Sequence, residues 1–588
     1  MYVLTHVVLC SAKRYPDFTP TGHIRPTITD RSQCPPVYTK PNCSGCPNTF
    51  ELQECDRVFN YWTATPDECS KAAFQFNTAQ PKNPDPCIIV MAQTSECIQE
   101  VVKKVTALRR EMEFKTLHIA IRGGRHSYIG ASTVSKGVVV DISRFDYVRQ
   151  HNDKGLMTVG AGITLSKLYY QLWSTLPNRL LFPGGTCPTV GLSGLTLGGG
   201  QGVVGRKYGL STDQVIEVQM VNSTANVMII NETSYEDLYW ALRGGGNGNF
   251  GIVYQFTLKR YEIPPVNTDY LIYFYNSSDW HTIISEWQEL ITDSSFKNSH
   301  NIWTQLTVTP KQLHIAFHVS GDEWKSNILQ RIEALAKTPD TSPSGYYENT
   351  PYIRCSYTPE NYSGSIAFWA GCTTDNQCGS TADLEKCLQL PSDCGGEPFR
   401  MNSGYQSGQL SDDGIHTIID YMLHVENITG CQNASIQLDT LGGKINEVQA
   451  NSTAFPHRND TVTYQFLSYF VSPCNEAAMI AWQDAFHKSM MKYMTPGAYR
   501  NYANLNLTLY NERYFRENLP MLVDIKGNYD PLNLFSYSQS IPAIKILPPI
   551  STTAPSSVIS LPYVVIGVVI MILVYVLWCS RSDHPHQE

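Results

Sequence analysis

The sequence predicts an α+β protein with more than one domain and a C-terminal membrane-spanning helix. The chain has 588 residues, too many for one small hydrophobic core. Residues 81–264 alternate strand-like apolar runs with amphipathic helical segments, and residues 265–495 continue with short strands and helices. Residues 559–578 carry no charge and form an apolar run long enough to cross a bilayer.

Residues 1–80 are loop-like and rich in cysteine. The 17 cysteines of the chain are spread along it, and ten Asn-x-Ser/Thr sequons accompany them. Both features indicate an oxidising, glycosylating compartment. No Cys/His cluster has zinc-site spacing, so no metal is predicted. The net charge of −8 argues against a nucleic-acid partner.

The C-terminal segments favour a true membrane span over a lipid-anchor signal. A Pro/Ser/Thr-rich linker at 547–558 precedes the apolar run, and a short polar tail at 579–588 follows it. The N-terminus resembles a weak signal peptide. We therefore expect a single-pass membrane protein with its folded part in the secretory lumen or outside the cell. A tail-anchored protein facing the cytosol is the alternative.

A helix and a strand open the αβ region. The segment "SECIQEVVKKVTALRREME" predicts a helix capped by Ser95, with one buried stripe. That stripe consists of Ile98, Val101, Val102, Val105 and Leu108. The apolar run 117–121 then predicts a strand.

The strand ends in "RGGRH", which predicts an anion-binding loop. Gly123 and Gly124 make a tight turn with exposed backbone amides, and Arg122 and Arg125 flank it. A second glycine-rich run covers 182–210. Glycine lets the main chain approach a large, flat, phosphorylated ligand. Neither run has the strand, G-x-G-x-x-G, helix and acidic residue of a Rossmann site in the required order.

Two nucleophilic side chains stand in these loops. His126 and Cys187 each follow a Gly-Gly pair in a loop that a cofactor could touch. Imidazole is a nucleophile near neutral pH, and a thiolate is one in electropositive surroundings. Taken alone, His126 is more often an ordinary hydrogen-bonded histidine, and Cys187 a buried thiol or half a disulfide.

The chain resembles the berberine bridge enzyme-like group of FAD-linked oxidases from about residue 70 to residue 545. The resemblance is carried, in this order, by "RGGRHSYIG", "PGGTCPTVGLSG", "LGGGQG", "DLYWALRGGGNGNFGIV", "AYRNYANLNL" and "IKGNYDPLNLFSYSQSIP". It implies a PCMH-type FAD-binding domain in two parts, 81–264 and a return at 496–546. An α+β substrate domain at 265–495 would be inserted between them.

The resemblance also implies how FAD is held. It links His126 to the 8α-methyl of the isoalloxazine ring and Cys187 to C6 of the same ring. The expected cofactor-binding residues are Arg122, Gly123, Gly124, Arg125, His126, Ser127, Cys187, Val190, Gly191, Gly194, Gly198, Gly199, Gly202, Gly251, Ile252 and Asn533.

The implied reaction removes a hydride from a CH–OH or CH–NH carbon of a small molecule and passes electrons to oxygen, giving hydrogen peroxide. The substrate could be a sugar, an alcohol or an alkaloid-like amine. The resemblance assigns the base to Tyr502, with Tyr499 nearby. Because a tyrosine pKa is about 10, a cation or the polarity of the active site must lower it. Lys444 is the candidate cation, and a solvent-exposed turn lysine is the alternative interpretation of this residue. Gln437 and Asp439 alternate with apolar residues, so they could face the substrate from one side of a strand.

Four positions depart from the family pattern. Arg125 replaces a glycine, and Leu195 stands where plant members often have histidine. Asn504 and Asn506 replace aspartates near Tyr502. Two alternatives therefore stay open: a cell-surface binding protein that no longer turns over, and a flavin dehydrogenase with an acceptor other than oxygen.

Overall fold

The computed structural model describes two main stretches of the chain, 86–321 and 398–543, and shorter pieces outside them. The two stretches lack 152–154, 175–178, 264, 276–278, 432 and 471–473. The shorter pieces are 50–55, 58–60 and 353–357 with the single positions 75, 79, 362, 366, 367, 380, 382 and 383. The chain separates into two compact units, Met1–Lys545 and Ile546–Glu588, and all described residues belong to the first.

A four-stranded sheet begins the described chain, in the order β1-β2-β4-β3. Its strands are β1 (Val58–Asn60), β2 (Ile88–Met91), β3 (Ile119–Arg122) and β4 (Val138–Asp141). β2, β4 and β3 run parallel, and β1 pairs antiparallel with β2. Parallel strands are covered on both faces, which is why all of β4 is buried and nearly all of it is valine.

Helix α2 (Ser95–Leu108) confirms the predicted amphipathic helix. Its cap is Thr94, one residue before the predicted Ser95, because the Thr94 side chain accepts a hydrogen bond from the Cys97 amide. Leu108 is only partly buried. The buried stripe consists of Cys97, Ile98, Val101, Val102 and Val105.

A five-stranded antiparallel sheet follows, in the order β5-β6-β10-β8-β9. Its strands are β5 (Val148–His151), β6 (Leu156–Gly160), β8 (Val215–Val221), β9 (Val227–Asn231) and β10 (Ile252–Lys259). One hydrophobic core joins this sheet to the first. Helix α16 (Leu519–Tyr529) packs against α6 (Glu236–Leu242), so residues late in the chain return to this part of the fold.

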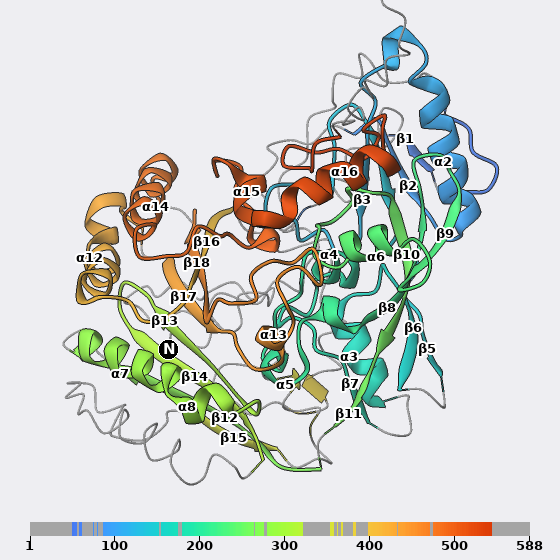
Figure 1. The fold of residues 1–588 in the computed structure, drawn as a ribbon. Helices are drawn as coiled ribbons and strands as arrows, with labels where there is room; N and C mark the ends of the chain where they lie inside the picture. The colour runs from blue at the N-terminus through green and yellow to red at the C-terminus, as the bar shows by residue number, and fades with distance from the viewer. Residues whose placement is uncertain are drawn as a thin grey trace, which may run out of the picture. The chain divides into compact units, whose positions relative to one another are not determined.

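A seven-stranded antiparallel sheet forms the other part of the unit, in the order β15-β12-β14-β13-β17-β18-β16. Its strands are β12 (Thr268–Tyr275), β13 (Ile302–Val308), β14 (Leu313–Ser320), β15 (Ile353–Tyr357), β16 (Phe399–Gln406), β17 (Ala434–Thr440) and β18 (Val462–Tyr469). One face packs against α7 (Trp280–Thr292), α12 (Asp412–Thr429) and α14 (Glu476–Met490) in a second core (Figure 1). The domain boundaries expected at 264 and 496 remain predictions.

The two faces of this sheet differ in chemistry because side chains alternate along each strand. In β17, Ile436 and Leu438 lie in the helix-covered core. Gln437 and Asp439 line a cavity on the opposite face, which agrees with the alternation seen in the sequence.

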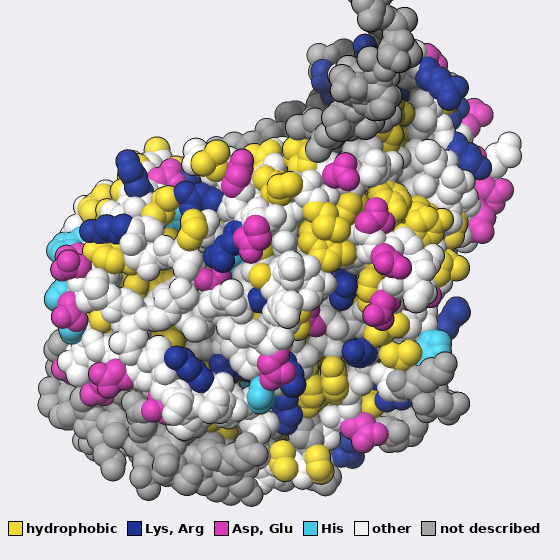
Figure 2. Space-filling model, viewed as in Figure 1, with side chains coloured by type: hydrophobic (Ala, Val, Ile, Leu, Met, Phe, Trp, Pro, Cys, Tyr) yellow, Lys and Arg dark blue, Asp and Glu magenta, His cyan; other side chains and the backbone are white. Residues whose placement is uncertain are grey.

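Shorter elements connect these layers. They are η2 (Met112–Phe114), α3 (Leu165–Ser174), β7 (Leu180–Leu181), α4 (Leu192–Leu197), α5 (Gly205–Tyr208), η3 (Ser211–Gln214), β11 (Tyr261–Glu262), α8 (Ser294–Asn298), α13 (Lys444–Glu447), η6 (Arg500–Tyr502), α15 (Tyr510–Phe515) and η7 (Arg516–Asn518). On the face drawn in Figure 2, basic and acidic side chains are interspersed.

The expectation of a membrane-spanning helix is corrected. A helix needs about 20 mostly apolar residues to cross a bilayer. No helix in the described part of the chain is long and apolar enough; the 18-residue α12 carries Asp412, Asp413, Asp420 and Glu426. The expected span at 559–578 lies outside the described residues. The single-pass location and the membrane partner are therefore withdrawn.

Candidate active site

A cavity of about 240 Å³ lies between the glycine-rich loops and the open face of the seven-stranded sheet. Of the residues predicted from the sequence, thirteen line it: Gly123, Gly124, Arg125, His126, Ser127, Cys187, Val190, Gly191, Gly194, Gly202, Gly251, Tyr499 and Tyr502. The sheet contributes side chains that include Trp303, Gln305, Phe399, Gln437, Asp439 and Gln465. The structure thus brings most of the predicted site together.

The two glycine-rich loops touch backbone to backbone. A Cβ at Gly124 would lie 2.1 Å from the Gly191 nitrogen, so no other residue fits there. Arg125 has a φ of 63°, a left-handed conformation that favours glycine. The glycine that the resemblance led us to expect at this position would adopt this conformation without strain.

The arginines of the first loop share a carboxylate. Arg122 Nε lies 2.7 Å from Asp141 Oδ2, and Arg125 Nη2 lies 3.4 Å from the same oxygen. Burial opposes ionisation of Asp141, but the two guanidinium groups hold its pKa below the usual value. Arg122 is buried and does not line the cavity, whereas Arg125 does. The loop therefore carries less uncompensated positive charge than its sequence indicates.

His126 lies in the cavity wall, and its Nε2 is 2.7 Å from Thr189 Oγ1. Burial lowers the pKa of His126 to about 3. The imidazole is therefore neutral at physiological pH, the form that acts as a nucleophile.

Cys187 also lines the cavity, but its sulfur is disulfide-bonded. A sulfur in a disulfide is not a thiolate and cannot at the same time bond to a ring carbon. Cys55–Cys97 and Cys431–Cys474 are two further disulfides among the described residues. The cysteine that the resemblance assigns to the flavin is thus engaged elsewhere in this structure.

Tyr499 positions the second glycine-rich loop. Its hydroxyl accepts hydrogen bonds from the amides of Gly200 and Gln201, at 2.9 and 3.3 Å, and from Asn501 Nδ2 at 3.0 Å. Burial raises the pKa of Tyr499 to about 12, although these donors favour the charged form. With its hydroxyl held by the loop, Tyr499 orders the cavity wall instead of facing a substrate.

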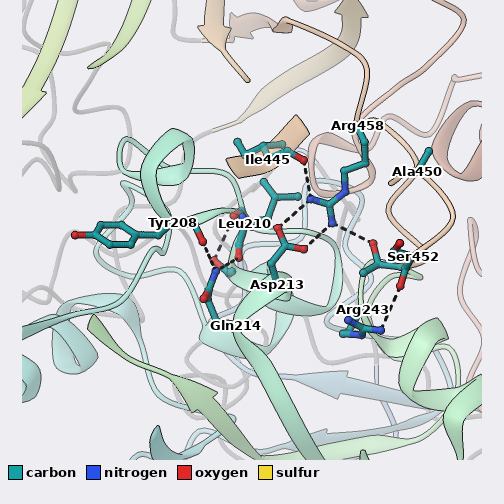
Figure 3. Close-up of polar contacts among 12 residues, drawn as sticks. Tyr208, Leu210, Asp213, Gln214, Arg243, Ile445, Ala450, Ser452 and Arg458 are labelled. Atoms are coloured by element: carbon teal, nitrogen blue, oxygen red, sulfur yellow. Dashed lines mark hydrogen bonds and ion pairs between the residues drawn. The ribbon is translucent and has the colours of Figure 1, made fainter. Parts of the chain in front are cut away.

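An ion pair lies next to the second glycine-rich loop and stabilises its C-terminal end (Figure 3). Arg458 donates to both oxygens of Asp213, from Nη1 at 2.9 Å and from Nη2 at 2.6 Å. Asp213 Oδ2 also accepts a 2.9 Å hydrogen bond from the Leu210 amide. Arg458 donates in addition to the Ile445 carbonyl. The pair therefore joins η3, next to the loop, to the chain around α13.

Tyr502 lies in the cavity wall between two other tyrosines. Its ring stacks on Tyr128 at 6.0 Å and meets Tyr499 edge-on at 4.7 Å. Burial, then the charge of Asp439, raises the pKa of Tyr502 well above its usual value. At neutral pH this phenol holds its proton.

Asp439 is the ionisable group of the cavity with the most suitable pKa for proton transfer. Burial raises its pKa to about 6, while a 2.7 Å hydrogen bond from Gln305 Nε2 opposes the shift. A base works best when its pKa is close to the working pH. The sequence predicted that Asp439 could face the substrate, but it did not identify Asp439 as the base. The available signal was a carboxylate within an otherwise uncharged strand.

Lys444 does not take part in the cavity. Its side chain is 51% exposed, and its ammonium pairs with Glu447, three residues further along the chain. It is absent from the cavity wall and is not the cation near Tyr502. Five of the predicted cofactor residues do not line the cavity either: Arg122, Gly198, Gly199, Ile252 and Asn533.

The lining fits a flavin nucleotide. Glycine backbone forms one wall, where added Cβ atoms would clash with neighbouring backbone, and aromatic rings form another. Asn247 Oδ1 is buried at this wall without a hydrogen-bond partner, as a group awaiting a ligand would be.

Comparisons with known proteins agree with this geometry. A family model described as "FAD binding domain" matches residues 87–231, and one described as "Berberine and berberine like" matches residues 498–542. These two segments contain the glycine-rich loops and the Tyr499–Tyr502 segment of the cavity.

Whole-chain relatives extend the match. The chain is 28% identical over 484 residues to "Uncharacterized FAD-linked oxidoreductase YgaK" of Bacillus subtilis, covering 81% of this chain and 95% of that protein. It is 27% identical over 505 residues to "Berberine bridge enzyme-like 1" of Arabidopsis thaliana, covering 81% and 86%. The solved structure of Physcomitrella patens BBE-like 1 matches with a TM-score of 0.69 and 26% identity, covering 81% and 96%.

Fold, cavity and family models together define an FAD-linked oxidoreductase. FAD is its cofactor, and the glycine-rich loops are the residues that suit it. Within that class, the chain is similar in sequence and in fold to the berberine bridge enzyme-like proteins.

Proposed function

We propose that the protein is an oxidase that removes a hydride from the CH–OH carbon of a neutral sugar or similar small alcohol, with Asp439 as the base. The observation that carries this proposal is the carboxylate of Asp439, with a pKa of about 6, in the same cavity as His126 and Tyr502. When bound, FAD accepts the two electrons and passes them to oxygen, which becomes hydrogen peroxide.

Asp439 takes the proton of the substrate hydroxyl. Its pKa lies just below neutral, so the group is mostly ionised there and still basic enough to accept a proton. The Gln305 amide fixes the carboxylate orientation from the neighbouring strand. Tyr502, which stays protonated, offers a hydroxyl donor that orients the substrate oxygen.

The cavity wall suits a hydroxyl-rich, uncharged substrate. Gln305, Gln437 and Gln465 lie on three neighbouring strands, and Gln437 and Gln465 are directly opposite each other. Amides donate and accept, so they can bind hydroxyl groups in either sense. Trp303 and Phe399 add apolar aromatic surface to the same cavity.

His126 is the attachment point of FAD in this proposal. Its imidazole is neutral, lies in the wall, and is oriented by Thr189. A second link to Cys187 requires that its disulfide first be reduced. Attachment through His126 alone is therefore the expected state of the oxidised protein.

Oxygen is the proposed acceptor, because the small Val190 lines the cavity beside the His126 loop and leaves room for it. The test is to screen the purified full-length chain with neutral sugars, alcohols and amines, and to compare oxygen with an artificial dye as acceptor. Turnover of sugars or alcohols with equimolar peroxide supports the proposal. Turnover only with the dye makes the protein a dehydrogenase, and turnover only of amines refutes the substrate class.

A further inference from the structure

Arg500 is a buried cation in the cavity wall. Its side chain is only 6% exposed, and it lies between Tyr499 and Asn501 in the segment that also carries Tyr502. An arginine side chain stays protonated in proteins, so this position is charged under all ordinary conditions.

The guanidinium of Arg500 contacts uncharged tyrosine side chains. Arg500 Nη2 donates a 2.6 Å hydrogen bond to the Tyr537 hydroxyl. The guanidinium carbon lies 5.3 Å from the ring centre of Tyr514 and 5.2 Å from that of Tyr537. Its Nε is buried without a hydrogen-bond partner.

Of the three other buried arginines among the described residues, two are neutralised by a carboxylate, and Arg206 instead donates to the backbone carbonyls of Leu441, Phe296 and Ser299. Arg122 pairs with Asp141, and Arg458 pairs with Asp213. Among the residues that the structure describes, no carboxylate forms an ion pair with Arg500. A buried charge without a counter-ion is costly, and aromatic faces offset only part of that cost. The site is therefore built for an anion.

Arg500 lies beside the glycine-rich loops. A Cβ at Gly246 would lie 3.2 Å from Arg500 Nε, so the backbone at 246 packs directly against the guanidinium. The next residue, Asn247, lines the cavity, and its Nδ2 lies 3.7 Å from where a Cβ of Gly194 would be. Gly246 and Asn247 therefore connect Arg500 to Gly194. Gly194 lies in α4, the helix that follows Gly191, and Gly191 is the residue that contacts Gly124.

We infer that Arg500 supplies the positive charge that holds the diphosphate of FAD. The sequence assigned this role to Arg122 and Arg125, but both share the carboxylate of Asp141. Arg500 is a cavity-lining guanidinium whose charge no described carboxylate offsets, and phosphate is the anion that a planar guanidinium binds best. The inference rests on the cofactor and not on the proposed oxidation of sugars.

The test compares FAD with riboflavin, which has the same ring system but no phosphate. Both are titrated by fluorescence into the full-length chain carrying His126→Ala and Cys187→Ala, so that binding is reversible. Arg500→Met should weaken FAD about tenfold to a hundredfold, the usual effect of losing a charge-assisted hydrogen bond, and leave riboflavin unchanged. Arg500→Lys, which keeps the charge, should recover part of the FAD affinity.

Tyr537→Phe is the matched control, since it removes the same Arg500–Tyr537 hydrogen bond but keeps the charge. It should leave the ratio of FAD to riboflavin affinity near that of the parent. Equal weakening of FAD and riboflavin by Arg500→Met would overturn the inference, because the residue would then only shape the cavity. Unchanged FAD affinity would overturn it as well. If Arg500→Met does not fold, the FAD affinity of Arg500→Lys is measured at increasing salt concentration. An affinity that does not change with salt would overturn the inference.

Discussion

Gln305 donates a 2.7 Å hydrogen bond from Nε2 to Oδ1 of Asp439, across the directly paired positions of strands β13 and β17. Burial raises the pKa of the carboxyl, and this hydrogen bond keeps the rise in check, so the pKa settles at about 6. The sheet thus places the proposed base beside Tyr502, whose own pKa burial raises well above its usual value.

Replacing Asp439 with asparagine should lower the activity and raise the stability. Asparagine keeps an acceptor for Gln305 but cannot take a proton, so flavin reduction should slow by about 10²- to 10⁴-fold. The raised pKa means that the partly buried carboxylate costs folding energy at neutral pH, on the order of 1–3 kcal/mol. Stopped-flow reduction should therefore fall while the melting temperature rises.

Lys444→Met is the control for that experiment. It also changes one charge, but in an exposed ion pair with Glu447 that lies outside the cavity wall. The rate of flavin reduction should stay within about twofold of the parent, since exposed pairs contribute little. A large loss of rate in this variant would return Lys444 to the catalytic site.

The pH dependence should follow the ionisation of Asp439. Because the base must be unprotonated, kcat/KM should increase with pH through about 6 and then level off. Stability should show the opposite trend: a pKa raised on folding stabilises the protein below the unfolded pKa of about 4, and this contribution is lost as pH rises through the folded value. Both trends should disappear in Asp439→Asn. If the kcat/KM step stays in that variant, another group is the base.

The attachment of FAD can be tested at His126. Since the Cys187 sulfur is in a disulfide, His126→Ala alone should release all flavin into the supernatant when the protein is precipitated with acid. The unaltered protein should keep its flavin in the pellet, on the peptide that contains His126. Flavin that stays in the pellet of the variant would show that Cys187 also forms a link.

The ion pair of Asp213 and Arg458 should be important for stability. Asp213→Asn leaves the guanidinium of Arg458, which is fully buried, without a counter-charge. The free energy of unfolding should fall by about 3–5 kcal/mol, the usual result of breaking a buried pair. Lys167→Met breaks a pair with Asp146 whose side chains are both nearly half exposed, and should cost less than about 1 kcal/mol. Equal losses in chemical denaturation would contradict a structural role for the buried pair.

Local patterns in the sequence predicted much of the fold. The periodicity of residues 95–108 gave α2 because its apolar stripe repeats at helical spacing. The alternation of apolar and polar residues in 436–439 correctly predicted which side chains of β17 lie in the core and which line the cavity. Each of these features depends on neighbours in the sequence.

Features that depend on distant partners could not be predicted in this way. Arg122 and Arg125 looked like phosphate ligands until strand β4 placed Asp141 beside them. Lys444 looked like an active-site cation, but its side chain points to Glu447 and solvent. The raised pKa of Asp439 follows from burial, which only the assembled cavity provides.

The most direct test of the account is anaerobic mixing of the full-length holoenzyme with a series of neutral sugars, with sugar acids and amines for comparison. We predict that at least one neutral sugar bleaches the flavin, that oxygen restores its colour with one peroxide per flavin, and that acids and amines do neither. Bleaching by none of the sugars or simple alcohols, with amines as the reductants, would contradict the proposed function.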